Sequence, residues 1–352
     1  MKILKYLFFL ILIAIIAGAI YVATKDGSYH IEESTIIKAP VSVVFDEVNN
    51  YETWENWGPW TKEDEKNVIL YSQNEQGEGA GFSWKNDDSG DGTITTTKVI
   101  PNSSIEQDLK FDSGIAESTS DVYWKFEEVE EGTEVTWGVK GNQTFMEKLA
   151  AVIDNEEISD LIRPKLEPVL EDLGAEVLEK MEAYAISVDG TTSHGGGFYM
   201  YTTAASKFPQ IQEQWEQMFS TVSQYMDTNN ITKLGNPFVL YNQVDESNNS
   251  AIFSVGIFTP SLVITPNESP VLNGMMPVQK VVKTTLKGDY KYLPEAWEEA
   301  NKYIQDNELQ IDAANAPFVV YKTGIDETPN PADWYTEIFI PLLQDPVLNT
   351  VE

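Results

Sequence analysis

The sequence predicts an α+β protein with one membrane-spanning helix followed by two domains built on antiparallel sheets. Three observations support this fold class. Residues 6–23 form an uncharged apolar run near the N-terminus. Strand-like runs separated by Gly, Asn, Asp and Ser fill residues 27–139, and a helical apolar stripe follows them. In the last third of the chain a helix-plus-hairpin pattern occurs twice with nearly constant spacing.

The first observation concerns residues 1–26, which we interpret as a signal anchor. The apolar run Tyr6–Ala23 would extend about 27 Å as a helix, close to the hydrocarbon thickness of a bilayer. Lys2 and Lys5 precede it, so the positive-inside rule predicts a cytoplasmic N-terminus. We therefore expect a single-pass protein of the cell inner membrane with extracytoplasmic, periplasmic domains. The alternative is a signal cleaved near Ala17-Gly18-Ala19, followed by secretion.

The second observation concerns the domain expected over residues 27–186. A strand over 29–37 is followed by a helix over 41–49 and an aromatic-rich segment over 51–60. Six further strands are expected at 68–71, 80–84, 93–100, 104–111, 117–127 and 133–139. A helical region over 142–185 closes the domain, and its apolar stripe comprises Leu166, Leu170, Leu173, Val177, Met181 and Tyr184. Pro164 and Pro168 predict a break or kink in this region.

This domain resembles the SRPBCC superfamily, also described as START-like or polyketide-cyclase/dehydrase-like. The resemblance is found in Ile37-Lys38-Ala39-Pro40, Val44-Phe45, Val48-Asn49-Asn50 and Trp54-Glu55-Asn56-Trp57-Gly58-Pro59-Trp60. It implies a helix-grip fold, in which a curved antiparallel sheet holds the long helix and an apolar cavity lies between them. Six tryptophans either line such a cavity or pack as core: Trp54, Trp57, Trp60, Trp84, Trp124 and Trp137.

The third observation is the repeat, expected over residues 198–345 after a flexible linker at 187–197. Pro237-Phe238-Val239-Leu240-Tyr241 returns 80 residues later as Pro317-Phe318-Val319-Val320-Tyr321. Each copy reads strand, helix, strand, strand. The first copy is predicted at 198–203, 209–226, 238–244 and 251–259, and the second at 280–286, 294–305, 318–323 and 334–340. Two copies of this kind usually pack about a pseudo-twofold axis and form a cleft.

The tandem βαββ pattern resembles the GyrI-like fold, also called the AraC-effector-binding or SOUL-related fold. The resemblance is found in the two Pro-Phe-Val-x-Tyr strands and in Trp334-Tyr335-Thr336-Glu337-Ile338-Phe339-Ile340-Pro341. It implies that a glutamate on the last strand, here Glu337, faces the cleft between the copies. It also implies that this glutamate meets cationic or amphipathic small molecules among aromatic side chains.

The repeat spacing also points to Glu337. A shift of 81 residues places Glu337 opposite Gly256, and Tyr335 opposite Ser254, so one copy offers a carboxylate and the other offers space. A carboxylate among apolar neighbours needs a partner, and a ligand cation near aromatic faces would be one. The alternative is a solvated Glu337 on an edge strand. The expected ligand-binding residues are Glu337, Tyr335, Trp297, Tyr199, Tyr201, Tyr241 and Tyr321.

Composition excludes several function classes. With 56 acidic and 23 basic residues the formal charge is −33, so no basic stripe exists to bind nucleic acid or anionic lipid head groups. The acidic surface either only keeps the chain solvated or also attracts cationic ligands. The absence of cysteine excludes thiol catalysis and Cys-ligated metals. His30 and His194 are the only histidines, and we interpret both as incidental, so neither a metal site nor a cofactor is expected.

These observations favour a membrane-tethered, extracytoplasmic small-molecule-binding protein without an evident catalytic constellation. The alternative is a hydrolase in which Glu337 acts as the base on a small electrophilic substrate, which requires a pKa raised by burial. A third hypothesis is a scaffold whose acidic surface binds partner proteins, which the sequence does not identify. Haem binding lacks a ligand because His194 is assigned to the linker.

Overall fold

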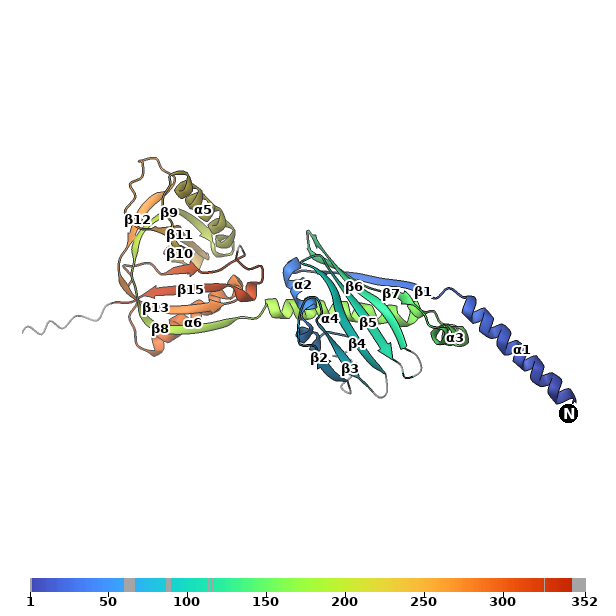
Figure 1. Cartoon of the computed structure of the whole chain (residues 1–352). Helices are drawn as coiled ribbons and strands as arrows, with labels where there is room; N and C mark the ends of the chain where they lie inside the picture. The colour runs from blue at the N-terminus through green and yellow to red at the C-terminus, as the bar shows by residue number, and fades with distance from the viewer. Residues whose placement is uncertain are drawn as a thin grey trace, which may run out of the picture. The chain divides into compact units, whose positions relative to one another are not determined.

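The computed structural model describes residues 2–59, 67–86, 90–112, 114, 117–325 and 327–343 (Figure 1). The chain divides into two compact units, Met1–Lys180 and Met181–Glu352. Each unit is built on one large antiparallel sheet, which confirms the predicted α+β class.

The first unit begins with the apolar helix α1 (Lys2–Thr24). Residues Ile3–Thr24 have a mean hydropathy of 2.7 and are exposed along nearly the whole helix. The helix is therefore long and apolar enough to cross a membrane, as signal sequences also are. Among the side chains of α1 that the structure describes, only Val22 in the last turn is buried.

A seven-stranded antiparallel sheet follows, in the order β1-β7-β6-β5-β4-β3-β2. Its strands are β1 (Ser28–Ile37), β2 (Val68–Tyr71), β3 (Gly81–Lys85), β4 (Asp91–Ile100), β5 (Ser104–Asp112), β6 (Glu117–Val129) and β7 (Gly132–Asn142). The first and last strands pair along their whole length, from Ser28 opposite Asn142 to Ile37 opposite Thr133. The seven strands lie close to where the sequence predicts them, because turn residues separate them and most contain runs of apolar or β-branched residues.

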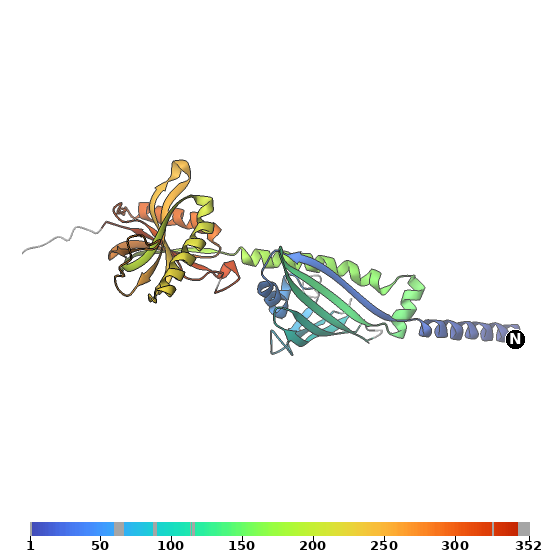
Figure 2. The ribbon, with the colours of Figure 1, turned by 90° about the horizontal axis from the view of Figure 1, so that it is seen from above.

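Four helical segments accompany this sheet: α2 (Val41–Asn49), η1 (Tyr51–Glu55), α3 (Phe145–Asp154) and α4 (Ile158–Met181). The helical region is divided at Asn155, which adopts a left-handed conformation with φ of 56°. Helix α4 continues through Pro164 and Pro168, so the prediction of a break at the prolines was wrong. Packing compensates for the lost backbone bonds, because α4 runs along the sheet (Figure 2) and buries Leu166, Val169, Leu170, Leu173 and Val177.

The second unit contains an eight-stranded antiparallel sheet in the order β12-β9-β11-β10-β14-β15-β13-β8. Its strands are β8 (Ala185–His194), β9 (Gly197–Lys207), β10 (Leu234–Asp245), β11 (Ser250–Thr259), β12 (Leu272–Met276), β13 (Gln279–Lys287), β14 (Phe318–Tyr321) and β15 (Tyr335–Pro341). The helical segments are α5 (Phe208–Thr228), α6 (Leu293–Asp306) and the short turns η2 (Glu246–Asn248), η3 (Tyr290–Tyr292) and η4 (Pro331–Asp333). From the β10–β14 contact outward, one half reads β10, β11, β9 and the other reads β14, β15, β13.

Residues 187–197 differ from the expected flexible linker. Strand β8 pairs with β13 from Ala185 opposite Lys287 to His194 opposite Gln279. The connection to β9 is also packed rather than free, since a Cβ on Gly196 would lie 2.2 Å from the Met276 carbonyl oxygen. Gly196 has a φ of +66°, a conformation that glycine adopts more easily than other residues. Glycine is therefore needed here for its backbone conformation and small size, and not for a flexible linker.

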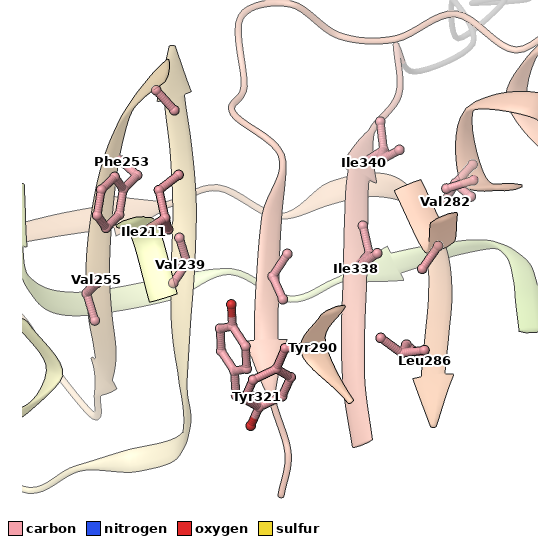
Figure 3. Close-up of a cluster of buried hydrophobic side chains, with 14 of the residues drawn as sticks. Ile211, Val239, Phe253, Val255, Val282, Leu286, Tyr290, Tyr321, Ile338 and Ile340 are labelled. Atoms are coloured by element: carbon pink, nitrogen blue, oxygen red, sulfur yellow. The ribbon is translucent and has the colours of Figure 1, made fainter. Parts of the chain in front are cut away.

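Helices α5 and α6 pack on the same face of the eight-stranded sheet, which we call the helix-covered face. Its core joins Ile211 of α5 to strand residues from both halves, such as Val239 and Ile338 (Figure 3). Ala300 of α6 and Val319 belong to the same core. The other side of the same strands, the opposite face, has a smaller aromatic core. That core comprises Phe238, Met276, Val281, Phe318, Val320 and Phe339, with Tyr199, Leu240 and Phe258 packed against it.

Candidate functional site

The structure divides the predicted ligand-binding residues between the two faces of the eight-stranded sheet. In β14, Phe318 and Val320 belong to the opposite face, whereas Val319 and Tyr321 belong to the helix-covered face. Val320 is the register partner of Glu337 in β15, which places Glu337 on the opposite face. Tyr321 therefore cannot lie beside Glu337.

Three of the predicted ligand-binding residues lie on the helix-covered face. Tyr321 is buried and stacks on Trp215 with ring centroids 4.6 Å apart. Tyr241 contacts Trp297 of α6 edge to face, at 5.7 Å. Burial raises the pKa of Tyr241 to about 12 and that of Tyr321 well above the usual value. Their hydroxyls are neutral parts of the core and do not line a site with Glu337.

The other three predicted aromatic residues share the face of Glu337. Tyr199 and Tyr201 lie on the same side of β9, two residues apart, with their ring centroids separated by 5.3 Å. The Tyr199 ring also packs against Phe238, at 5.2 Å. Burial raises the pKa of Tyr199. Tyr335 precedes Glu337 by two residues in β15, is 42% exposed, and has the Lys287 ammonium 5.8 Å from its ring centroid.

Glu337 is already paired within the protein. One carboxylate oxygen lies 2.9 Å from the Lys283 ammonium nitrogen, and the other lies 3.8 Å from that of Lys322. The side chain is only 19% exposed. The carboxylate is therefore neither solvated nor without a partner, and the partners that it needs among apolar neighbours are two lysines of the protein itself.

The ion pairs of Glu337 extend into a network across three strands. Lys283 also lies 3.3 Å from Asp189 of β8, and the Thr285 hydroxyl donates to the same Asp189 oxygen at 2.7 Å. The hydrogen bond to Glu337 is the main cause that raises the pKa of Lys283. Sequence reasoning missed Lys283 and Asp189 because their proximity depends on strand register, which the repeat alone does not specify.

The space expected opposite Glu337 is filled. A Cβ on Gly256 would lie 2.5 Å from the tip of the Phe238 ring, so this glycine makes room for Phe238. Ser254 also has partners within the protein. Its hydroxyl forms a hydrogen bond with the Thr203 hydroxyl at 2.8 Å and accepts one from the Asn242 side-chain amide at 2.7 Å. The two copies do differ at Gly256 and Glu337, but the space beside Gly256 is occupied by the Phe238 ring.

His194 is the residue that sequence reasoning undervalued. Its ring lies at the end of β8 with its centroid 4.8 Å from that of Phe318 and 5.3 Å from that of Phe339. Burial lowers the pKa of His194, while the charge of Glu337 partly opposes this effect. The Gly196 backbone N–H donates to Nδ1 at 3.2 Å, so a neutral ring carries its proton on Nε2. The alternation of Ile186 and Val188 was the available signal that this segment is a strand.

The tryptophans of the first unit form a packed core and not the wall of an open cavity. Trp54, Trp57 and Trp124 are almost fully buried, with ring centroids 4.8 to 6.0 Å apart. Trp137 stacks on Trp124 at 4.9 Å, and Trp84 packs against Phe82. Trp60, which the sequence grouped with them, lies outside the described residues.

Among the described residues there are surface grooves that lie away from Glu337. One, of about 420 Å³, lies over strands β3 to β6 and is lined by residues such as Trp84, Lys85 and Lys110. Another, of about 490 Å³, lies between α5 and strands β9 to β11 and is lined by residues such as Ser206, Gln214 and Gln243. Within the described residues, no group of three His, Asp or Glu side chains is arranged to hold a metal ion.

The comparisons with known proteins found one family profile and several solved structures that are similar to part of the chain. Residues 176–343 match the profile of the GyrI-like small molecule binding domain. The chain is also similar to the crystal structure of the EcmrR C-terminal domain, with 17% identity, a TM-score of 0.39, and coverage of 46% of this chain and 99% of that one. No curated protein matches the sequence.

Two further solved structures are similar over part of the chain. EcmrR in a complex with DNA shares 16% identity, with a TM-score of 0.40 and coverage of 58% of this chain and 78% of that one. An uncharacterized protein from Rhizobium leguminosarum shares 15% identity, with a TM-score of 0.35 and coverage of 44% of this chain and 97% of that one.

Proposed function

Since residues 176–343 form a GyrI-like domain, we propose that this domain binds a small molecule on the opposite face, beside Glu337. The observation that supports the proposal is the charged network of Glu337, Lys283 and Lys322 directly beside an aromatic core. Phe318 and Phe339 stack at 4.8 Å on the strands that hold Glu337 and its register partner. Binding sites for small molecules commonly combine aromatic walls with a few placed charges.

The proposed ligand is an amphipathic molecule whose cationic group replaces Lys322 at Glu337. Lys322 is the weaker partner, because it is 43% exposed and its nitrogen lies 3.8 Å from the carboxylate. Lys283 is held by both Glu337 and Asp189 and would stay in place. The ligand's apolar part would contact Tyr335 and the exposed edges of the aromatic core.

The sign of the Lys322 effect tests this proposal. A panel of hydrophobic cations is titrated calorimetrically against the full-length protein in mild detergent. We expect Glu337→Gln to weaken binding about tenfold or more, because a charged hydrogen bond is lost. Lys322→Met should tighten binding, because the competing ammonium is gone. Tyr321→Phe, on the helix-covered face, is the matched control and should leave the affinity for these cations unchanged.

Other outcomes distinguish the remaining possibilities. If Lys322→Met weakens the binding of every cation that binds, Lys322 does not compete with the ligand for Glu337, and the proposed exchange is wrong. If no member of the panel binds, or if Glu337→Gln and Tyr321→Phe behave alike, the Glu337 site is not the binding site.

We also propose that α1 anchors the protein in the inner membrane with both units outside the cytoplasm. Lys2 and Lys5 before the apolar run support this orientation. Protease added to spheroplasts should cleave the second unit, and protection of that unit would contradict the orientation.

For the first unit we propose an SRPBCC-like helix-grip fold. The order of strand, helix, six strands and long helix supports it.

The geometry does not favour the hydrolase alternative. A general base must reach the proton of an attacking water. Both oxygens of Glu337 already face ammonium groups, at 2.9 and 3.8 Å. Turnover of an electrophilic ester that is lost in Glu337→Gln would reverse this preference.

A further inference from the structure

The short helix α3 has an apolar side that nothing in the described residues covers. None of its ten residues is buried. Met146 and Phe145 are each 44% exposed, and Ile153 is 72% exposed. Met146, Ala150 and Ile153 recur at intervals of four and three residues, so they share one side of the helix. In the next helix, Leu161 is also exposed.

This helix is nevertheless well formed, which argues against a frayed segment. Thr144 and Glu147 make a capping box, in which each side chain accepts a hydrogen bond from the other residue's backbone N–H. Asn155 ends the helix in a left-handed conformation. A rigid, capped helix with exposed apolar side chains is a surface suited to docking.

The position of α3 is tied to the end of α1. The Lys148 ammonium donates to the Lys25 carbonyl at 2.7 Å, and the Gln143 N–H donates to the Gly27 carbonyl at 2.8 Å. Gly27 allows this close approach, because a Cβ there would lie 2.3 Å from the Lys148 side chain. Strand pairing places Ser28 opposite Asn142, so the chain leaves α1 beside the start of α3. Figures 1 and 2 show the two helices at the same end of the first unit.

The last turn of α1 has the features of a membrane–water boundary. Tyr21 is exposed, and the Lys25 ammonium lies 5.3 Å from its ring centroid. Tyrosine and lysine at the end of an apolar helix are typical of the interface between hydrocarbon and water. If α1 spans the bilayer, the contacts of Lys25 and Gly27 hold α3 at the level of the lipid head groups.

We propose that α3 lies on the lipid surface and inserts Met146, Ile153 and Phe145 into the boundary between head groups and acyl chains. This inference rests on the proposed membrane anchoring by α1. Helix α3 contains Glu147, Lys148 and Asp154 as its only charged residues, so the attraction is apolar and does not need anionic lipid. The tether and the interfacial helix together would fix the orientation of the first unit on the membrane.

Single-cysteine labelling tests the proposal, since the chain contains no cysteine of its own. The full-length protein is reconstituted at one copy per nanodisc of phosphatidylcholine and labelled with an environment-sensitive fluorophore. Ile153→Cys reports on α3 and Ile11→Cys on the middle of α1. Glu171→Cys, at an exposed residue of α4, is the water control. Nitroxide lipids with quenchers at different depths then locate each label.

We expect the label at residue 153 to emit at shorter wavelength than the label at 171. Nitroxides near the head groups should quench it most strongly, at a depth of about 5–10 Å. The label at residue 11 should be quenched by deep nitroxides. Adding Met146→Glu should shift the emission at residue 153 back toward that at 171, and replacing half the lipid with phosphatidylglycerol should not increase its quenching.

Three results would overturn the proposal. If residue 153 matches residue 171 while residue 11 is deep, α1 anchors the protein but α3 faces water. If residue 11 is not quenched by lipid, the membrane anchoring itself fails. If the blue shift at residue 153 requires two copies per disc and lipids do not quench it, a second copy of the chain covers α3 instead.

Discussion

The two faces of the eight-stranded sheet are made by the same strands but differ in what their side chains can do. On the helix-covered face, residues such as Val319 and Ile338 are fully buried in the core that includes α5 and α6. Figure 3 shows Ile338 among the side chains of this core. On the opposite face, a small aromatic core borders a network of lysines and carboxylates that is partly exposed. One face stabilises the fold, and the other holds the charges that a ligand could meet.

The comparison shows that strand parity decides which residues can form a site. Glu337 and Ile338 are neighbours in sequence, yet one is in an ion-pair network and the other is in the core. Tyr321, the last residue of β14, is expected from the sequence to bind a ligand, but it lies on the helix-covered face. A residue one position away, Val320, is beside Glu337 instead.

The largest expected difference between the faces is in stability. Ile338→Ala should lower the free energy of unfolding by about 2–5 kcal/mol, because it leaves a cavity in a fully buried core. The neighbouring change Glu337→Gln should cost about 1 kcal/mol or less, since Lys283 keeps its contact with Asp189. Calorimetric unfolding of the full-length protein in detergent measures both variants.

An equal cost for these two changes would contradict the division of roles between the faces. Thr336→Val is a further check, because Thr336 is fully buried and its hydroxyl has no hydrogen-bond partner among the described residues. Replacing that hydroxyl with a methyl group should not destabilise the protein.

The next expected effect is a loss of stability at alkaline pH from the helix-covered face. Burial raises the pKa of Tyr241 to about 12, whereas an unfolded tyrosine has a pKa of about 10. Between these values the unfolded state loses its proton first, so stability is complete below pH 10 and falls as the pH rises toward 12. Unfolding by urea at several alkaline pH values should show a shallower decline in Tyr241→Phe than in the wild type.

An acid-dependent loss is expected from the opposite face. Burial lowers the pKa of His194 in the folded protein. Below its unfolded pKa of about 6.5 the unfolded state takes up the proton first, so stability is complete above that pH and falls on acidification. His194→Phe keeps a ring beside Phe318 and should remove part of this decline. An NMR titration in which the His194 ring takes up its proton above pH 6.5 would falsify the assignment.

The sequence predicted the element order well because the strands and helices carry strong local signals. The stripe with Leu166, Leu170 and Leu173 is buried as expected, and Pro209 and Pro294 lie in the first turns of α5 and α6. The repeat also led to Glu337, which the structure places in a charged network. These are properties of short segments, which local patterns can specify.

The remaining features depend on register and on close packing, which local patterns do not specify. Lys283 meets Glu337 because the pairing of β13 with β15 places Thr285 opposite Glu337 and Phe339 opposite Lys283. The sequence predicts that Gly196 belongs to a flexible linker, but its neighbour Met276 lies 80 residues further along the chain and leaves no room for a side chain. The face of each tyrosine follows from alternation within its strand, so the sequence contains a signal that Tyr241 and Tyr321 lie on the side of Val239 and Val319.

The smallest expected effect is the difference in stability between variants of the two lysines on the opposite face, Lys322 and Lys283. Lys322→Met should change the free energy of unfolding by less than about 0.5 kcal/mol, because an exposed ion pair at 3.8 Å contributes little. Lys283→Met should cost more, about 1–2 kcal/mol, because it leaves Glu337 and Asp189 without their shared ammonium group at 2.9 and 3.3 Å. Raising the salt concentration should reduce both costs. If Lys322→Met is the more destabilising change, Lys322 is a structural partner of Glu337. A ligand cation could then not replace it without loss of stability, and the exchange that we propose at this face would not occur.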